Sequence, residues 1–228
     1  MTARICVSIL PKNNVEALSL IDQAEKAKAD FIEVRLDCLE TSRNISELSK
    51  RTKIPLIATN KLRSEKGCFS GTETERQQTL LNAAKNGFEY VDVDMSSPKL
   101  KDRIEKLKQL GAKSIVSFHK FDGILSSSEM GNILKQEIST GAAICKIVTS
   151  AKKIEDNLSV LNFISAMPSR VKLVCFCMGE NGKISRLLSP MFGAFFTFAS
   201  LEQGSETASG QISIQDMRIA YDLLGAKW

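Results

Sequence analysis

Histidine is scarce in this chain of 228 residues, which contains one. A single histidine excludes the multi-histidine metal sites of many zinc and iron enzymes. Long apolar runs are also missing, because the longest, such as residues 173–178, are strand-sized and fall short of the roughly 18 residues that span a bilayer. The first residues lack a signal-peptide pattern and read as a strand. We therefore expect a cytoplasmic protein without a membrane segment.

The six cysteines include no Cys-x-x-Cys pair. A chain of this length needs no disulfides to fold, and a zinc site would require more ligands at paired spacing. Cys175 and Cys177 are two residues apart in an apolar segment and share a face. We expect all six to be reduced thiols of the core, with no metal and no cofactor.

Aromatic residues make up only 6% of the chain, and the net charge at pH 7 is +5. A mildly basic charge is compatible with nucleic-acid binding, but the lysines are scattered along helical patterns and form no basic stripe. A small anionic substrate fits this charge better. We expect no nucleic-acid partner.

Apolar segments of strand length alternate with segments of helical periodicity from end to end. The predicted strands begin near Arg4, Phe31, Ile54, Glu89, Lys113, Ala143, Lys172 and Ala194. The predicted helices include apolar stripes at Leu100, Ile104, Leu107, Leu110 and at Ile154, Leu158, Leu161, Ile164, capping boxes at Thr72-x-x-Glu75 and Ser126-x-x-Glu129, and a last helix near 213–224.

Eight strands alternating with eight helices in a chain of this length predict an α/β fold, a closed (β/α)₈ TIM barrel. No linker or charge block divides the chain, so residues 1–228 are predicted to form a single catalytic domain. A doubly wound open sheet is the alternative, although no Gly-x-Gly-x-x-Gly motif follows the first strand.

Polar residues interrupt several predicted strands, and in a barrel the chemistry lies at the carboxyl ends of the strands. Glu33 and Arg35 alternate with Ile32, Val34 and Leu36, so the charged pair should point inward. Buried charges are costly unless paired or used. An internal ion pair between the two is the structural alternative to a functional site. The predicted strand that begins near Glu89 repeats this alternation of charged and apolar residues, with Asp92 and Asp94.

Lys146 lies inside an apolar strand, and His119, the only histidine, ends the strand before it. A lysine in such a segment can extend to the surface instead. If Lys146 is held in a pocket, we expect burial and nearby cations to lower its pKa. A lowered pKa favours the neutral amine, which can attack a carbonyl. His119 is well placed for acid–base work.

At this point the sequence resembles type I 3-dehydroquinate dehydratase, the Schiff-base enzyme of the shikimate pathway. The resemblance covers nearly the whole chain and rests on six motifs in order. They are Glu33-x-Arg35-x-Asp37, Ser117-Phe118-His119, Lys146, Met178-Gly179-x-x-Gly182-x-x-Ser185-Arg186, Phe192-Gly193-Ala194-x-x-Thr197-Phe198-Ala199 and Ala208-x-Gly210-Gln211.

The resemblance implies a barrel, usually dimeric, that dehydrates 3-dehydroquinate to 3-dehydroshikimate without a metal. Lys146 would form the Schiff base with the C3 ketone. His119 would take the C2 proton and protonate the departing C1 hydroxyl, with Glu65 orienting it. The resemblance assigns substrate binding to Glu33, Arg35, Lys61, Arg186, Thr207 and Gln211, with Arg186 on the carboxylate.

Two departures from the family pattern concern binding. Lys61 stands where the family usually has an arginine, and Arg63 follows two residues later, so either could contact the substrate. The last motif lacks the usual proline before Gly210, which would leave this predicted lid more mobile before closure.

Two rival functions remain open at the level of sequence. A class I Schiff-base aldolase would share the barrel and the lysine, and Gly179-x-x-Gly182 could bind a phosphate. A catalytically silent barrel that binds a metabolite or partner would need neither Lys146 nor His119.

Overall fold

The computed structural model describes residues 2–40, 45–168 and 170–228. In this part of the chain, eight strands form one sheet in the order β7-β6-β5-β4-β3-β2-β1-β8, and every pairing is parallel. The strands are β1 (Ile5–Ile9), β2 (Phe31–Arg35), β3 (Leu56–Thr59), β4 (Tyr90–Asp94), β5 (Lys113–His119), β6 (Ile144–Ser150), β7 (Leu173–Met178) and β8 (Thr197–Ala199).

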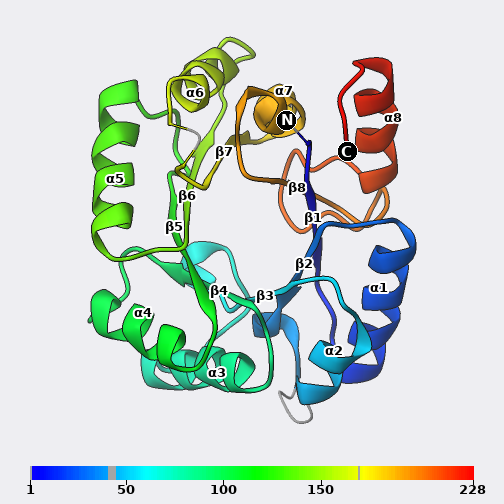
Figure 1. The fold of residues 1–228 in the computed structure, drawn as a ribbon, viewed down its shortest axis with the longest axis vertical. Coiled ribbons are helices and arrows are strands. Elements are labelled where there is room, and N and C mark those ends of the chain that lie inside the picture. The colour runs from blue at the N-terminus through cyan, green and yellow to red at the C-terminus, as the bar shows by residue number, and fades with distance from the viewer. Residues whose placement is uncertain (1, 41–44, 169) are drawn as a thin grey trace.

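The strands curl into a barrel with the helices outside it (Figure 1). β1 pairs with β2 on one side and β8 on the other, and the Phe195 N–H before β8 donates to the Leu173 carbonyl of β7 at 2.7 Å. This closure confirms the predicted barrel over the open sheet. The helices are α1 (Asn14–Lys26), α2 (Ile45–Arg51), α3 (Glu73–Lys85), α4 (Leu100–Gln109), α5 (Ser127–Ser139), α6 (Asp156–Ser165), α7 (Lys183–Leu188) and α8 (Ile214–Leu223).

Both predicted capping boxes begin helices. Thr72 accepts a hydrogen bond from the Glu75 N–H and Glu75 accepts one from the Thr72 N–H, at the start of α3. Ser126 and Glu129 do the same at the start of α5. These reciprocal bonds satisfy N–H groups that a helix start otherwise leaves unpaired. None of the described helices is long and apolar enough to cross a bilayer.

The stripe predicted for α6 is wrong at its first two positions. Ile154 and Leu158 are each 59% exposed. The reason is local: the Lys152 and Lys153 N–H groups donate to Asp156, which starts the helix after Ile154. The prediction is confirmed at Leu161 and Ile164, and the buried face of the helix adds Val160 and Phe163 to them.

The alternation along the strands creates two kinds of interior. Residues that point outward, such as Ile32, Val34 and Leu36, pack against the helices in a large apolar cluster. Residues that point inward form an apolar plug at one level, with Phe31, Phe196 and Phe198 among its members. Above the plug, nearer the carboxyl ends, the inward residues are polar and buried: Ser8, Glu33, Thr59, Asp92, Ser117 and Lys146.

The expectation of six core thiols is correct for four cysteines and wrong for two. Cys6, Cys145, Cys175 and Cys177 are buried, and all six cysteines are free. Cys38 is half-buried and Cys68 is exposed, because Cys38 ends a short 3₁₀ turn after β2 and Cys68 lies in the loop after β3. Hydrophobic periodicity gives no information about such positions.

Glu137 of α5 is fully buried behind β6, and no cation lies within ion-pair distance of it in the described structure. Burial raises the pKa of its carboxyl to about 9. The folded protein therefore retains a proton on Glu137 at a pH where the unfolded chain has released it.

This proton predicts a pH dependence of stability. Between about pH 5 and pH 9, the free energy of unfolding should fall by roughly 1.4 kcal/mol per pH unit because of Glu137 alone. Glu137→Gln should abolish this part of the slope in urea unfolding at a series of pH values. Glu105→Gln, on the exposed side of α4, serves as the control and should leave the slope unchanged. Equal slopes in wild type and Glu137→Gln would contradict the assignment.

Candidate active site

A cavity of about 400 Å³ opens at the carboxyl ends of the strands. It gathers side chains from β2, β3, β5, β6, β7 and β8, together with the loops after β3, β7 and β8. All nine residues that the sequence singles out as catalytic or binding line this cavity. They are Glu33, Arg35, Lys61, Glu65, His119, Lys146, Arg186, Thr207 and Gln211.

Lys146 projects from β6 into the buried polar layer. Its Nζ lies 3.0 Å from Asp92 Oδ2 and 3.8 Å from Glu33 Oε1, and 4.3 Å above the Phe198 ring. Burial lowers the pKa of Lys146, but the two carboxylates outweigh it, and the net result is a raised pKa. The expected lowering is therefore wrong: sequence indicated burial and nearby cations, but the carboxylates on neighbouring strands reverse the direction.

Asp92 of β4 connects two lysines. Its Oδ1 accepts hydrogen bonds from Lys61 Nζ at 2.8 Å and from Ser117 Oγ at 2.8 Å, while Oδ2 accepts from Lys146. The carboxyl is fully buried, which would raise its pKa, yet Lys146 and Lys61 hold that pKa far below the ordinary value. Asp92 therefore stays ionised and balances the buried ammonium groups.

Lys61, and not Arg63, reaches the cavity. Lys61 is buried, and its Nζ also donates to Ser117 Oγ at 3.0 Å. Arg63 is exposed and lies outside the residues that line the cavity. The loop after β3 turns back on itself at this point, since the Phe69 N–H donates to the Lys61 carbonyl at 3.1 Å.

Glu33 and Arg35 both point inward, as the alternation predicts, but they do not form the alternative ion pair. Glu33 accepts hydrogen bonds from Ser8 Oγ and, at 2.9 Å, from Thr59 Oγ1. Arg35 forms a bidentate pair with Asp37, with nitrogen–oxygen distances of 2.6 and 2.9 Å. Each residue is held separately at the cavity wall.

His119 ends β5 at the mouth of the cavity, with its ring stacked on Phe121 at a centroid distance of 5.9 Å. Burial of the imidazole, followed by the charges of Lys61 and Lys146, lowers its pKa well below the ordinary 6.5. The ring is therefore neutral at pH 7 and able to accept a proton.

Glu65 lines the same cavity but does not hydrogen-bond His119. Its Oε2 accepts from the Leu62 N–H at 3.2 Å and lies 3.9 Å from Arg76. Burial raises the pKa of its carboxyl. The orienting role that the resemblance implies for Glu65 is therefore supported by its position in the same cavity as His119, but not by a direct contact.

Arg186 of α7 is a buried cation without a carboxylate in the described structure. It is 1% exposed, its Nε has no hydrogen-bond partner, and its guanidinium lies over the Phe176 ring at 4.3 Å. Burial lowers its pKa to about 10, so it remains charged at neutral pH. Its Nη2 donates a hydrogen bond to the Ser209 carbonyl at 3.5 Å. A buried guanidinium that has no carboxylate partner and lines a cavity is a strong site for a carboxylate.

The loop after β8 closes against the loop after β7. The Gly179 N–H donates to the Ser209 carbonyl at 3.1 Å, and the Thr207 N–H donates to Gln211 Oε1 at 2.7 Å. Gly210 has a φ of +78°, and a Cβ there would meet the Gly179 carbonyl oxygen at 2.1 Å. Only glycine allows this approach, which holds Thr207 and Gln211 over the cavity beside Arg186.

Two residues that organise the site have no role predicted from the sequence. Asp92 and Ser117 provide the contacts between Lys61 and Lys146. The sequence did contain a signal for an inward-pointing Asp92, because this residue alternates with apolar residues in its strand as Glu33 does. The identity of the lysines that contact Asp92 depends on the register of β4 with its neighbours, and one sequence does not reveal that register.

Comparisons with known proteins agree with this geometry. A family model described as type I 3-dehydroquinase matches residues 5–227. A 3-dehydroquinate dehydratase of Dehalococcoides mccartyi is 36% identical over 204 residues, which covers 88% of this chain and 90% of that protein.

Solved structures resemble the chain over nearly its full length. The 3-dehydroquinate dehydratase of Geobacillus kaustophilus superposes with a TM-score of 0.88 at 23% identity, covering 99% of this chain and 92% of the other. At that identity the likeness concerns the fold. The enzyme of Aquifex aeolicus gives a TM-score of 0.81 at 26% identity, covering 96% and 98%. With the family model matched across almost every residue, the chain belongs to the type I 3-dehydroquinase family.

Proposed function

We propose that this chain is a 3-dehydroquinate dehydratase, a hydro-lyase of the shikimate pathway that leads to aromatic amino acids, and that it acts through a Schiff base on Lys146. Family membership supports the reaction. One observation supports the route: the Lys146 amine, a neutral imidazole and a guanidinium without a carboxylate partner in the described protein line the same cavity. The substrate is a keto-acid, and these three groups match its ketone, its acidic C–H bond and its carboxylate.

The carboxylate of 3-dehydroquinate binds to Arg186 in this proposal. Its anionic charge would compensate a buried cation that has no carboxylate partner in the described protein. Gln211 and Thr207, on the loop that rests against Gly179, complete the binding of this end of the substrate. The carboxylate thereby fixes the ring relative to Lys146.

The raised pKa of Lys146 is compatible with Schiff-base formation. The ammonium transfers a proton to His119, the free amine attacks the C3 ketone, and the proton returns as the carbinol hydroxyl leaves as water. An iminium has the same charge as the ammonium it replaces. Asp92 and Glu33, which raise the pKa of Lys146, therefore also stabilise the iminium.

His119 is the general base and then the general acid. The iminium withdraws electrons from C2, so the neutral imidazole can remove the C2 proton and form an enamine. The imidazolium then protonates the C1 hydroxyl, which leaves as water while the iminium re-forms. General acid–base assistance of this kind contributes roughly 10²–10⁴-fold to the rate.

The remaining residues position the ring and the histidine. Glu33 and Arg35 line the cavity wall on β2 and are assigned to the ring hydroxyls, with Lys61 beside them. Glu65 is assigned to His119 as a positioning residue, supported by their shared cavity.

We also propose that residues 1–228 are one catalytic domain that works as a homodimer in the cytoplasm. Resemblance to a usually dimeric family supports the dimer, as do apolar side chains that remain exposed along α8, among them Ile219, Leu223 and Leu224. Membership of a biosynthetic enzyme family supports the location.

Removal of the amine provides the first test. Lys146→Ala should lower kcat by on the order of 10⁴-fold or more, because no covalent route remains. Borohydride reduction with 3-dehydroquinate should add one substrate-derived mass to Lys146 of the wild type and none to the variant. Lys153→Ala, an exposed lysine outside the cavity, should keep both adduct and activity. Full activity in Lys146→Ala would remove the Schiff base from the mechanism.

The pKa of His119 predicts the acid limb of the pH profile. A base whose pKa is lowered stays neutral as the pH falls, so kcat/KM should remain level from pH 8 to about 6.5 and decline only below that. His119→Ala should lower kcat by roughly 10²–10⁴-fold and lose this limb. A limb above pH 6.5 in the wild type, measured by 3-dehydroshikimate absorbance, would contradict the assignment.

Two glycines of the loop after β8 form a matched pair of test positions. Both have positive φ, but a Cβ at Gly210 meets backbone at 2.1 Å, whereas nothing lies within 4 Å of one at Gly204. Gly210→Ala should raise KM by roughly tenfold or more, and Gly204→Ala should leave KM nearly unchanged.

Substrate or product should also slow proteolysis of the wild type between residues 204 and 211. In Gly210→Ala, we expect that substrate or product no longer slows this proteolysis. Equal KM values in the two glycine variants, or cleavage that the substrate does not affect, would contradict a closing lid.

A further inference from the structure

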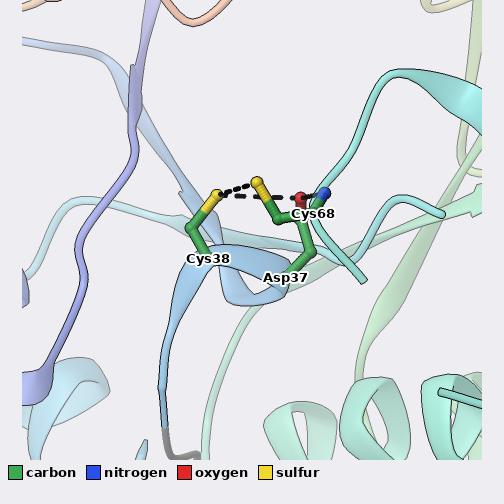
Figure 2. Close-up of side chains that lie close together, drawn as sticks. All are labelled: Asp37, Cys38 and Cys68. Atoms are coloured by element: carbon green, nitrogen blue, oxygen red, sulfur yellow. Dashed lines mark hydrogen bonds between the residues drawn. The ribbon is translucent and has the colours of Figure 1, made fainter. Parts of the chain in front are cut away.

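Two cysteines outside the active-site cavity lie in contact. Cys38 ends a short 3₁₀ turn, η1 (Leu36–Cys38), directly after β2, and Cys68 lies in the loop between β3 and α3. Their Sγ atoms are 3.2 Å apart although the residues are 30 positions apart in sequence, and the two side chains point toward each other (Figure 2). A disulfide has a sulfur–sulfur distance of about 2.05 Å, so a movement of about 1 Å would join them.

The backbone beneath the two thiols is held in place by several contacts. Asp37 Oδ2 accepts a hydrogen bond from the Cys68 N–H at 2.9 Å, and Arg35 pairs with the same carboxylate (Figure 2 shows the Asp37 carboxylate beside Cys68). The loop is also tied across its base, since the Arg63 N–H donates to the Phe69 carbonyl at 3.2 Å. The proximity of the thiols therefore follows from fixed backbone on both sides.

The two thiols differ in access. Cys68 is exposed, whereas Cys38 is half-buried. Burial raises the pKa of Cys38 to about 12, with further contributions from its hydrogen bond to Cys68 and from Asp37. Modification of Cys68 removes that hydrogen bond. This arrangement suits Cys68 as the thiol that reacts first and Cys38 as the thiol that resolves the product.

A metal ion fits the same three residues less well. Asp37, Cys38 and Cys68 place one ligand atom each within 4.8 Å of the others. However, the Asp37 carboxylate is already engaged by Arg35 through two hydrogen bonds, the shorter 2.6 Å long. A cation here would have to share its carboxylate ligand with a guanidinium beside it, which opposes binding.

We propose that Cys38 and Cys68 form a thiol-oxidation site that reacts with low-molecular-weight disulfides to give an intramolecular disulfide. The Cys68 thiolate attacks one sulfur of the small disulfide and releases one small thiol. The Cys38 thiolate then attacks Cys68 Sγ of the mixed disulfide and releases the second. The protein loses two protons and two electrons, and one small disulfide gains them and becomes two small thiols.

The disulfide would link η1 to the loop that carries Lys61 and Glu65. Both residues lie inside the segment that the Cys38–Cys68 bond would close. The site is independent of the proposed dehydratase activity, since neither cysteine lines the active-site cavity.

The test uses the full-length reduced protein and oxidised glutathione. After exposure, the protein is denatured and alkylated, and its intact mass is measured. All six thiols are free before oxidation, so we expect alkylation of four after it, without retained glutathione and with a mapped peptide joining Cys38 to Cys68. Alkylation of all six after exposure, or glutathione that remains on Cys68 of the wild type, would overturn the proposal.

Three variants separate the steps. Cys38→Ser should retain one glutathione on Cys68, because the resolving thiol is missing. Cys68→Ser should react at least about tenfold more slowly, because Cys38 is half-buried and less accessible to glutathione than the exposed Cys68. Cys175→Ser, from the buried pair in β7, should oxidise like the wild type. Similar glutathione uptake by Cys38 and Cys68 in the single variants would contradict the assigned order.

Zinc provides a separate arm of the same experiment. One equivalent of zinc chloride, without oxidant, should leave the alkylation rate of Cys68 in the native protein unchanged. Protection of both thiols by zinc that a chelator reverses would identify a metal site and overturn the proposal.

Discussion

The ionic contact of Asp92 with Lys61 and Lys146 is the interaction on which the rest of the site depends. The three groups lie inside the barrel, at nitrogen–oxygen distances of 2.8 and 3.0 Å, where an unpaired charge would cost several kcal/mol. Removal of Asp92 would leave the two buried ammonium groups with more distant carboxylates, Glu33 at 3.8 Å from Lys146 and Asp94 at 3.9 Å from Lys61. The inward positions above the aromatic plug can therefore be polar only because opposite charges arrive there together from β4, from β6 and from the loop after β3.

The charge arrangement also separates the chemical roles. The carboxylates keep Lys146 cationic, whereas the same lysines and burial keep His119 neutral. Arg186 lines the same cavity and has no carboxylate partner in the described protein, so the cavity offers a buried positive charge to an anionic group as well as carboxylates that favour a positive charge on Lys146. A single cavity thus holds a stable positive centre, a proton acceptor and an anchor for a carboxylate, as the dehydration of a keto-acid requires.

Rigid and adaptable parts of the molecule contribute different residues. The strands fix Glu33, His119 and Lys146, because their backbones are hydrogen-bonded on both sides within the closed barrel. Arg186 follows β7 on the short helix α7, and Gln211 lies in the loop after β8, which rests on Gly179 through Gly210. The same division applies to Cys38 and Cys68, whose contact arises between two loops that follow neighbouring strands.

The sequence by itself determined the alternation of strands and helices, the capped starts of α3 and α5, and the inward direction of Glu33 and Arg35, because these follow from periodicities and motifs that are local in the chain. Its resemblance to a known family supplied the nine assigned site residues, all of which are among those that line the cavity. The tertiary structure alone decided the direction of the Lys146 pKa shift, the choice of Lys61 over Arg63, the role of Asp92 and the contact of Cys38 with Cys68. The physical reason is that electrostatic energies depend on distances of a few ångströms between residues on different strands. Those distances are set by barrel closure and strand register, which no local pattern contains.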